Sequence, residues 1–206
     1  MTVCIEPLAV EEIPTCTEIY LQAFAEDKFS LAAFPRNDIA NLSAWWTDMF
    51  LDEYQSQRAA RFVKGMVNGQ IVAFAKWNIP TRNADGDLEQ GGDDPDDPPT
   101  YPSHANQDLA NKFLGTLARK RYQIMDLEMI ATLPEYQGQG AASKLIQWGL
   151  DIADRIEAEA YLESNEENVL FYQRFGFTIV EDYVLEELSY RESFMLRAAK
   201  KSSLPA

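Results

Sequence analysis

A short glycine-rich run, Gln137-Gly-Gln-Gly140, offers the clearest chemistry in this chain. It follows a β-rich segment that ends at Pro134 and precedes residues with helical spacing. Glycines at such a turn let the backbone approach a ligand closely, and the first N–H groups of a helix have no intrahelical acceptor. Together these groups can hold an anion such as a phosphate. The run therefore predicts an anion site between a strand and a helix, with close packing as the competing interpretation.

Two familiar phosphate-binding patterns are excluded here. The P-loop pattern G-x-x-x-x-G-K-[ST] does not occur, and a Rossmann fingerprint would need a third glycine where the chain has Ser143. The predicted anion site therefore has to be of another kind.

The segments on either side of the turn are typical of a strand and a helix. Before the turn, two sets of residues alternate with a period of two: Leu127, Met129 and Ala131 against Asp126, Glu128 and Ile130. After the turn, apolar and small residues follow helical spacing: Ala142, Leu145, Ile146, Gly149, Ile152, Ala153 and Ile156. Because successive side chains of a strand point to opposite faces, we expect Asp126 and Glu128 to share one face.

The residue pattern of this region resembles that of the GNAT-type N-acetyltransferase superfamily. Gln137-x-x-Gly140-x-Ala142 matches the acyl-CoA signature [QR]-x-x-G-x-[GA] of that family. Downstream, Asn165, Tyr172 and Gly176-Phe177 match its N-x(6)-Y-x(3)-G-F segment. The two motifs occur in the family's order and at its usual separation. The resemblance covers about residues 122–180 and is strongest to small fungal members.

The resemblance implies an α/β (α+β) fold of the GNAT type, with a central mixed, mostly antiparallel sheet of about six to seven strands flanked by helices. The central strand, over 122–133, and the next, over 159–164, would run parallel and splay apart to admit the pantetheine arm. We expect one domain over residues 1–198 and a flexible tail over 199–206. The stretch 80–104, rich in Asp, Pro and Gly, is expected to be a mobile surface insertion.

The same resemblance implies acetyl-CoA, released as CoA, as co-substrate, and no metal. The residues expected to contact it belong to the central strand, the turn, the following helix and the second motif: Ile130, Ala131, Thr132, Gln137, Gly138, Gln139, Gly140, Ala141, Ala142, Ser143, Asn165 and Tyr172. Arg174 or Lys144 is expected to help offset the negative charge of the ligand. Asn165 could also cap the next helix, in competition with Ser164 of a capping box.

Acyl transfer from a thioester to an amine makes three demands: a base for the amine's proton, a donor that polarises the carbonyl, and a proton or hydrogen bond for the leaving thiolate. By resemblance, Tyr172 serves the thiolate and the backbone N–H of Ile130 serves the carbonyl. Asp126 stands where histone-type members carry their glutamate base, and Glu128 is nearer the thioester, so both are candidate bases. Either could instead pair with Arg or Lys.

Two amphipathic segments, 10–27 and 37–57, are predicted helices that in GNAT folds wall the acceptor site. By resemblance, Phe29, Phe34 and Trp45 could line an apolar substrate pocket, with core packing as the competing interpretation. The other elements follow from periodicity and turn signals: strands over 2–8, 60–67, 70–79, 161–164, 177–183 and 190–197, and helices over 105–121 and before Gly176.

Composition narrows the function classes. The formal net charge of −15 argues against nucleic acid and an acidic membrane surface as partners, while it permits a cationic substrate. The apolar runs are shorter than a membrane span, the first residues lack a secretory signal pattern, and two cysteines imply no disulfide framework, so a cytoplasmic location is expected. The leading hypothesis is N-acetylation of a small amine; alternatives are peptide acetylation and a non-catalytic CoA-binding domain. A homodimer is one expected assembly, since GNAT-type proteins are frequently dimers.

Overall fold

A mixed sheet forms the centre of the computed structural model, which describes residues 2–82, 88–89, 96, 98–121 and 124–200. Within these residues the sheet has seven strands in the order β1-β2-β3-β6-β7-β9-β8. Their bounds are β1 Cys4–Pro7, β2 Ala60–Val67, β3 Gln70–Asn78, β6 Met125–Thr132, β7 Ala160–Asn165, β8 Thr178–Leu185 and β9 Tyr190–Arg197. Only β6 and β7 pair in parallel; the other neighbours are antiparallel. The predicted mixed, mostly antiparallel sheet is therefore confirmed.

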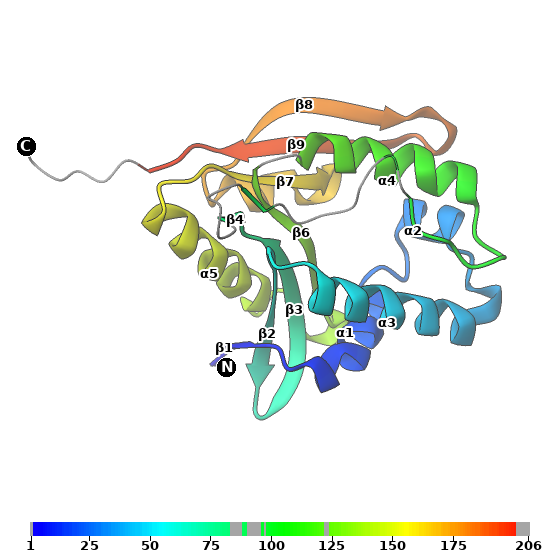
Figure 1. Ribbon diagram of the computed structural model, residues 1–206, viewed down its shortest axis with the longest axis horizontal. Coiled ribbons are helices and arrows are strands. Elements are labelled where there is room, and N and C mark those ends of the chain that lie inside the picture. The colour runs from blue at the N-terminus through cyan, green and yellow to red at the C-terminus, as the bar shows by residue number, and fades with distance from the viewer. Residues whose placement is uncertain (1, 83–87, 90–95, 97, 122–123, 201–206) are drawn as a thin grey trace, which may run out of the picture.

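Helices cover both faces of this sheet (Figure 1). One face carries α1 Ile13–Ala23, α2 Lys28–Ala33, α3 Ile39–Ser56 and α4 Gln107–Arg121; the other carries α5 Ala141–Arg155 and α6 Val169–Gln173. Each helix buries an apolar stripe against the strands, so that the sheet separates two hydrophobic cores.

A missing side chain lets α5 approach the sheet closely. A Cβ atom on Gly149 would lie 2.1 Å from the Trp77 ring, so only glycine fits there. The Trp77 indole also donates from Nε1 to the Leu145 carbonyl at 3.3 Å. These contacts fix the position of α5 against the sheet, and with it the position of the glycine-rich run that precedes the helix.

Most predicted elements form close to their expected bounds, but the first helical region is divided. The predicted helix over 10–27 consists of a 3₁₀ turn, Val10–Glu12, followed by α1. The link after it, which was predicted as an apolar connection, contains the short helix α2. Asp27 caps α2, because its Oδ1 accepts from the Ser30 N–H at 2.7 Å.

Parts of the stretch 80–104 lie outside the described residues, namely 83–87, 90–95 and 97, so the prediction of a mobile insertion stays open there. Its ends are described. The pairs β4 Thr81–Arg82 and β5 Leu88–Glu89 form a two-stranded ladder. Tyr101 is buried, and the Trp45 indole donates to the Thr100 carbonyl at 2.8 Å, so the segment before α4 packs on α3 rather than lying free in solvent.

The predicted tail over 199–206 is described only as far as Lys200, whose Nζ lies 2.8 Å from Asp154 Oδ2. Residues 122–123, at the start of the predicted central strand, are also outside the described part. In the portion of the chain that is described, no helix combines the length and apolar character needed to cross a membrane.

Candidate active site

The glycine-rich turn has the backbone geometry that an anion site needs. After a 3₁₀ turn, η3 Pro134–Tyr136, Gly138 and Gly140 have φ angles of +73° and +89°, a region that side chains disfavour. A Cβ atom on either glycine would meet nothing within 4 Å, so the turn is open on the side where a ligand would lie. Gly140 is the N-cap of α5 and no side chain caps the helix, which leaves the first N–H groups available to a ligand.

A long groove with a volume of about 1160 Å³ runs along this turn. Ten of the residues predicted to contact the co-substrate line it: Ile130, Thr132, Gln137, Gly138, Gly140, Ala141, Ala142, Ser143, Asn165 and Tyr172. Ala131 and Gln139 do not, contrary to expectation. Ala131 points into the core under α1–α4, and the Gln139 amide turns back to donate to the Glu135 carbonyl at 2.8 Å.

The groove exists because β6 and β7 diverge. They pair only from Met125–Ala160 to Leu127–Leu162, and the more C-terminal parts of both strands have separate partners. Tyr172, on α6, lines the groove where the strands have parted. Its ring contacts Phe177 edge-on, with centroids 6.4 Å apart. Burial raises the pKa of Tyr172 above its usual value, and the negative charge of Glu192 adds to this, so the hydroxyl stays protonated and can donate.

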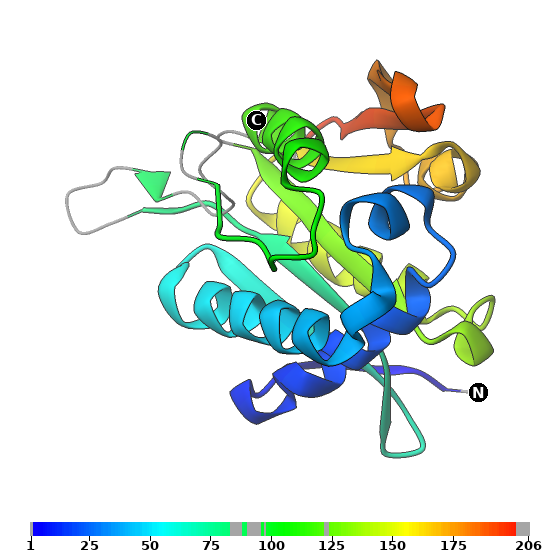
Figure 2. The same cartoon turned by 90° about the vertical axis from the view of Figure 1, so that its right-hand side faces the viewer.

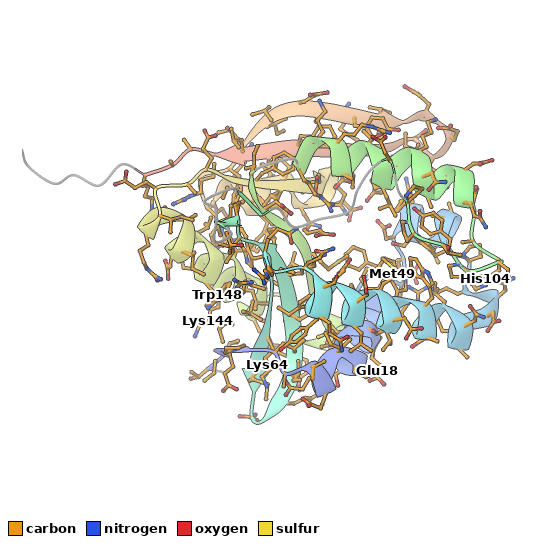
Figure 3. All side chains as sticks on the ribbon, in the orientation of Figure 1. Glu18, Met49, Lys64, His104, Lys144 and Trp148 are labelled. Atoms are coloured by element: carbon orange, nitrogen blue, oxygen red, sulfur yellow. The ribbon has the colours of Figure 1, made fainter. Side chains whose placement is uncertain are left out.

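Four polar residues around the groove have distinct tasks. Gln137 donates from Nε2 to the Thr132 carbonyl at 3.3 Å, which ties the turn to the end of β6. Asn165 Oδ1 accepts from the Asn168 N–H at 3.2 Å and thereby caps the next turn, so the cap is Asn165 and not Ser164. Arg174 lines the groove, whereas Lys144 donates to the Val3 carbonyl at 2.6 Å and holds β1 (Figure 3).

A β-bulge interrupts the alternation predicted for β6. Lys76 pairs with Met129 and Trp77 with Leu127, so Glu128 is an extra residue without a partner on β3. The prediction that Leu127, Met129 and Ala131 share one face is therefore wrong: Leu127 lies in the α5 core, and Met129 and Ala131 lie in the other. The bulge places Glu128 and Met129 in one cavity and Ile130 in the groove.

The two predicted carboxylates do lie together, as expected from their spacing. The Asn78 amide donates to Asp126 at 3.1 Å and to Glu128 at 2.7 Å. Glu128 also contacts Lys76 Nζ at 2.7 Å and Arg121 Nη1 at 3.1 Å. Burial alone would raise the pKa of Glu128, but these two cations outweigh it and lower that pKa to about 2. Burial raises the pKa of Asp126 well above its usual range.

The ion network around Glu128 was not predicted. Lys76, only 1% exposed, also lies 2.9 Å from Glu53 Oε2, and Arg121 Nε lies 3.0 Å from Glu163 Oε1. The sequence contains one indication of this network. Lys76 follows Phe74 by two residues in an apolar strand and so shares its inward face. Arg121, at the end of a basic run on α4, gave no such signal.

Glu192 is a further buried carboxyl that the sequence did not single out. It pairs across β7–β9 with Asn165, and its Oε2 has no hydrogen-bond partner among the described residues. Burial raises the pKa of Glu192 to about 8, and the nearby Glu163 and Asp27 contribute. It lies one residue beyond Arg191, a residue of the groove wall.

A second cavity, of about 270 Å³, lies between α3 and α4; we call it the α3–α4 pocket. Trp45, Trp46, Phe50 and Tyr101 supply aromatic walls. The charged residues of the lining are Glu53, Lys76, Arg119, Arg121 and Glu128. Figure 2 shows the two helices on the same side of the sheet, with the segment before α4 between them, and Figure 3 labels Met49, which lines the pocket from α3.

Of the three predicted acceptor residues, only Trp45 lines this pocket. Phe34 is buried behind it, with its ring stacked on Trp45 at 5.5 Å. Phe29 packs on Phe113 at 4.0 Å, in the core beneath α2 and α4. Because α2 turns both phenylalanines inward, the core-packing interpretation holds for them. No group of three potential metal ligands is found in the described ranges.

Comparison with known proteins decides the family. A model of the acetyltransferase (GNAT) family matches residues 21–177, most of the chain. The chain belongs to the GNAT acetyltransferase family. It is therefore an acyltransferase, with acetyl-CoA as the co-substrate of its family.

Individual relatives are more distant. The probable acyltransferase SID5 of Ajellomyces capsulatus is 38% identical over 39 residues, a match that spans 19% of this chain and 29% of that protein. The fold extends much further. A structure described as histone acetyltransferase HPA2 and related acetyltransferase, from Corynebacterium glutamicum, superposes with a TM-score of 0.68 at 20% identity, covering 99% of this chain and 100% of that one.

Two other solved structures share this fold. The ribosomal-protein-S18-alanine N-acetyltransferase of Escherichia coli has a TM-score of 0.59 at 16% identity, with both chains fully covered. The PaiA N-acetyltransferase of Thermoplasma acidophilum, in complex with coenzyme A, has a TM-score of 0.60 at 15% identity, covering 96% of this chain and 99% of that one. At such identities the likeness concerns the fold alone.

Proposed function

We propose that this protein transfers the acetyl group of acetyl-CoA to the amine of a small molecule. The observation that carries the proposal is that consecutive residues of β6 line two different cavities. Glu128 and Met129 line the α3–α4 pocket, and Ile130 lines the long groove. An amine in the pocket and a thioester in the groove would approach each other at this bulge.

The long groove fits the co-substrate in shape and chemistry. The open space over Gly138 and Gly140 accommodates a group that a side chain would exclude, and the first N–H groups of α5 favour negative charge. Arg174 in the groove wall adds a positive charge to a protein that is acidic overall. In this proposal the pyrophosphate lies on the turn and the pantetheine arm follows β6 toward Ile130.

The transfer forms one C–N bond and breaks one C–S bond. The amine nitrogen attacks the acetyl carbonyl, the backbone N–H of Ile130 stabilises the charge that develops on oxygen, and the sulfur leaves. The Tyr172 hydroxyl donates its proton to the leaving sulfur, and the amine gives up a proton in turn. The products are the N-acetylated amine and CoA, and Tyr172 regains its proton from solvent.

The ion network changes the expected role of the strand carboxylates. A group whose pKa is about 2 is a weak base, so Glu128 serves better to accept a hydrogen bond from the amine and direct its lone pair toward Ile130. Asp126 is 1% exposed and lines neither cavity. In this proposal it therefore does not contact the amine directly. A water molecule in the pocket would carry the amine's proton to solvent.

A small acceptor is favoured over a peptide because the pocket is small, about 270 Å³, with walls from α3, α4 and Tyr101. The test is thiol release from acetyl-CoA against phenylalkylamines, polyamines, amino acids and basic peptides, with CoA binding measured by calorimetry. Turnover of a small amine is expected. Turnover of peptides alone would reverse the choice of acceptor, and CoA binding without any turnover would favour a non-catalytic domain.

A further inference from the structure

We infer that Asp27, Tyr190 and Glu192 form a path that returns a proton from solvent to Tyr172 after each acetyl transfer. The inference rests on the proposed function, in which Tyr172 gives its proton to the leaving sulfur. It adds three positioning residues, which act through Tyr172.

The inner end of the path is Glu192 on β9. It shares one face of the sheet with Tyr190 and Phe194, both of which pack in the core beneath α1–α4. Its partner across β7–β9 is Asn165, a residue of the long groove. Glu192 Oε2 is buried and has no hydrogen-bond partner among the described residues. Because an ionised oxygen in such a place is costly, the position suits a carboxyl group that holds a proton.

The charged groups that face Glu192 support the protonated form. Burial raises the pKa of Glu192 to about 8, with contributions from Glu163 on β7 and Asp27 before α2. A hydrogen bond from Tyr190 and the charge of Arg121 on α4 act in the opposite direction but do not outweigh these effects. At neutral pH Glu192 therefore has a proton to give.

Tyr172 is close enough to Glu192 to respond to its charge. Burial, and then the negative charge of Glu192, raise the pKa of Tyr172 above its usual value. The phenolate that remains after Tyr172 has protonated the sulfur is consequently a much stronger base than the Glu192 carboxylate. Transfer of a proton from Glu192 to this phenolate is therefore favourable.

The middle of the path is the Tyr190 hydroxyl, which lies between two carboxyl groups. It donates to Asp27 Oδ2 at 3.1 Å and also hydrogen-bonds Glu192. A hydroxyl has one proton and two lone pairs, so it can accept a proton from one side while it gives its own to the other. Burial and the two neighbouring carboxylates raise the pKa of Tyr190, so it passes protons on without remaining ionised.

The outer end of the path is Asp27, which is half-buried and lines the groove. Its Oδ1 caps α2 by accepting from the Ser30 N–H at 2.7 Å, and this cap holds Oδ2 toward Tyr190. The start of β9 accordingly lies next to α2 (Figure 1). The path thus leads from the wall of the groove into the protein.

The protons balance over one turnover. Glu192 gives a proton to the Tyr172 phenolate, and the Glu192 carboxylate then takes one from Tyr190. Tyr190 in turn takes a proton from Asp27, which solvent has protonated. Since the amine releases one proton to solvent, the complete reaction neither gains nor loses a proton.

The first test is the titration of Glu192 by NMR, with ¹³C at the glutamate carboxyl groups and with Glu192→Gln to identify its signal. We expect a midpoint at about pH 8. Tyr190→Phe removes a hydrogen bond that favours the ionised carboxyl, so the midpoint should rise by about half to one pH unit. The matched control is Tyr183→Phe, because the Tyr183 and Tyr190 rings both pack on Phe113, at 6.1 and 5.7 Å. It should leave the midpoint unchanged.

The second test is thiol release at saturating acetyl-CoA with the fastest amine of the panel. Glu192→Gln and Tyr190→Phe should each lower kcat about tenfold or more and leave the KM for acetyl-CoA within about twofold. Imidazole, whose protonated form is a small acid at neutral pH, should restore part of the lost rate in both variants and should not accelerate the wild type or Tyr183→Phe. A merely structural defect would not respond to imidazole.

A Glu192 midpoint in the ordinary range of about 4–5 would overturn the inference, because no proton would then be held at neutral pH. A midpoint that Tyr190→Phe does not move, or a kcat that neither variant lowers, would also overturn it. The titration requires no turnover, so it judges the path even if no amine is acetylated, an outcome that would overturn the proposed function instead.

Discussion

Tyr172→Phe removes one hydroxyl from the groove and leaves the ring that packs against Phe177. Among the described residues the structure gives this hydroxyl no hydrogen-bond partner, so we expect little change in stability. Its raised pKa keeps it protonated and able to donate at neutral pH. Loss of one positioned donor to a developing negative charge costs about 2.7–4 kcal/mol, a fall in kcat of roughly 10²–10³-fold.

The assay is the initial rate of thiol release with both substrates saturating, together with calorimetric binding of CoA. The affinity for CoA should stay within about threefold, because the hydroxyl acts on the transition state. Tyr183→Phe, the same change on β8 outside both cavities, is the control and should keep the wild-type rate. A kcat for Tyr172→Phe within threefold of the wild type would refute the assignment of the proton donor.

Further predictions concern the glycine-rich turn, the packing of α5 on Trp77, the ion network around Glu128 and the dependence of stability on pH. Gly140→Ala strains a residue at φ +89° by about 1–2 kcal/mol and should weaken acetyl-CoA binding about tenfold in calorimetry; unchanged affinity would contradict the anion site. Gly149→Ala forces a Cβ atom to within 2.1 Å of Trp77 and should lower the free energy of unfolding in urea by about 1–3 kcal/mol or more; an unchanged midpoint would contradict this packing. Lys76→Met removes the cation that contacts both Glu53 and Glu128 and leaves Glu128 with Arg121 alone among the described cations, so it should cost about 3–5 kcal/mol in the same assay; an unchanged midpoint would contradict the contribution of these ion pairs. The pKa of Glu192 is raised from 4.5 to about 8 in the folded state, so its contribution to stability is present below pH 4.5 and is lost as pH rises to 8. Glu192→Gln should therefore flatten the fall in Tm between about pH 5 and 8. Parallel curves of Tm against pH for the wild type and the variant would refute this.

The predictions that depended on local backbone chemistry were the most accurate. The turn at Gln137–Gly140 had to leave the β region, and glycine is the residue that tolerates the φ angles found at Gly138 and Gly140. Asn68-Gly69, between the strands predicted over 60–67 and 70–79, is a dipeptide typical of a hairpin turn, and both residues have positive φ in the β2–β3 hairpin. Amphipathic spacing identified α3, α4 and α5, because each helix buries a single stripe. Such signals lie within a few residues of one another, so the sequence alone is sufficient to find them.

Predictions that required knowledge of distant partners were less complete. Side-chain direction in β6 depends on one bulge opposite β3, and a strict period of two could not reveal it. Whether Phe29, Phe34 or Trp45 faces a cavity depends on how α2 turns between its neighbours.

The sequence by itself indicated the family, the fold class and the glycine-rich turn, because contiguous motifs carry those signals. Tertiary structure alone decided the state of Glu128 and the shape of the acceptor side. Lys76 on β3 and Arg121 on α4 lie far from Glu128 in the chain, and only the packed fold brings their charges within 3.1 Å of that carboxylate. A buried charge takes its properties from the elements that surround it, and here the two cations come from β3 and α4, two separate parts of this chain.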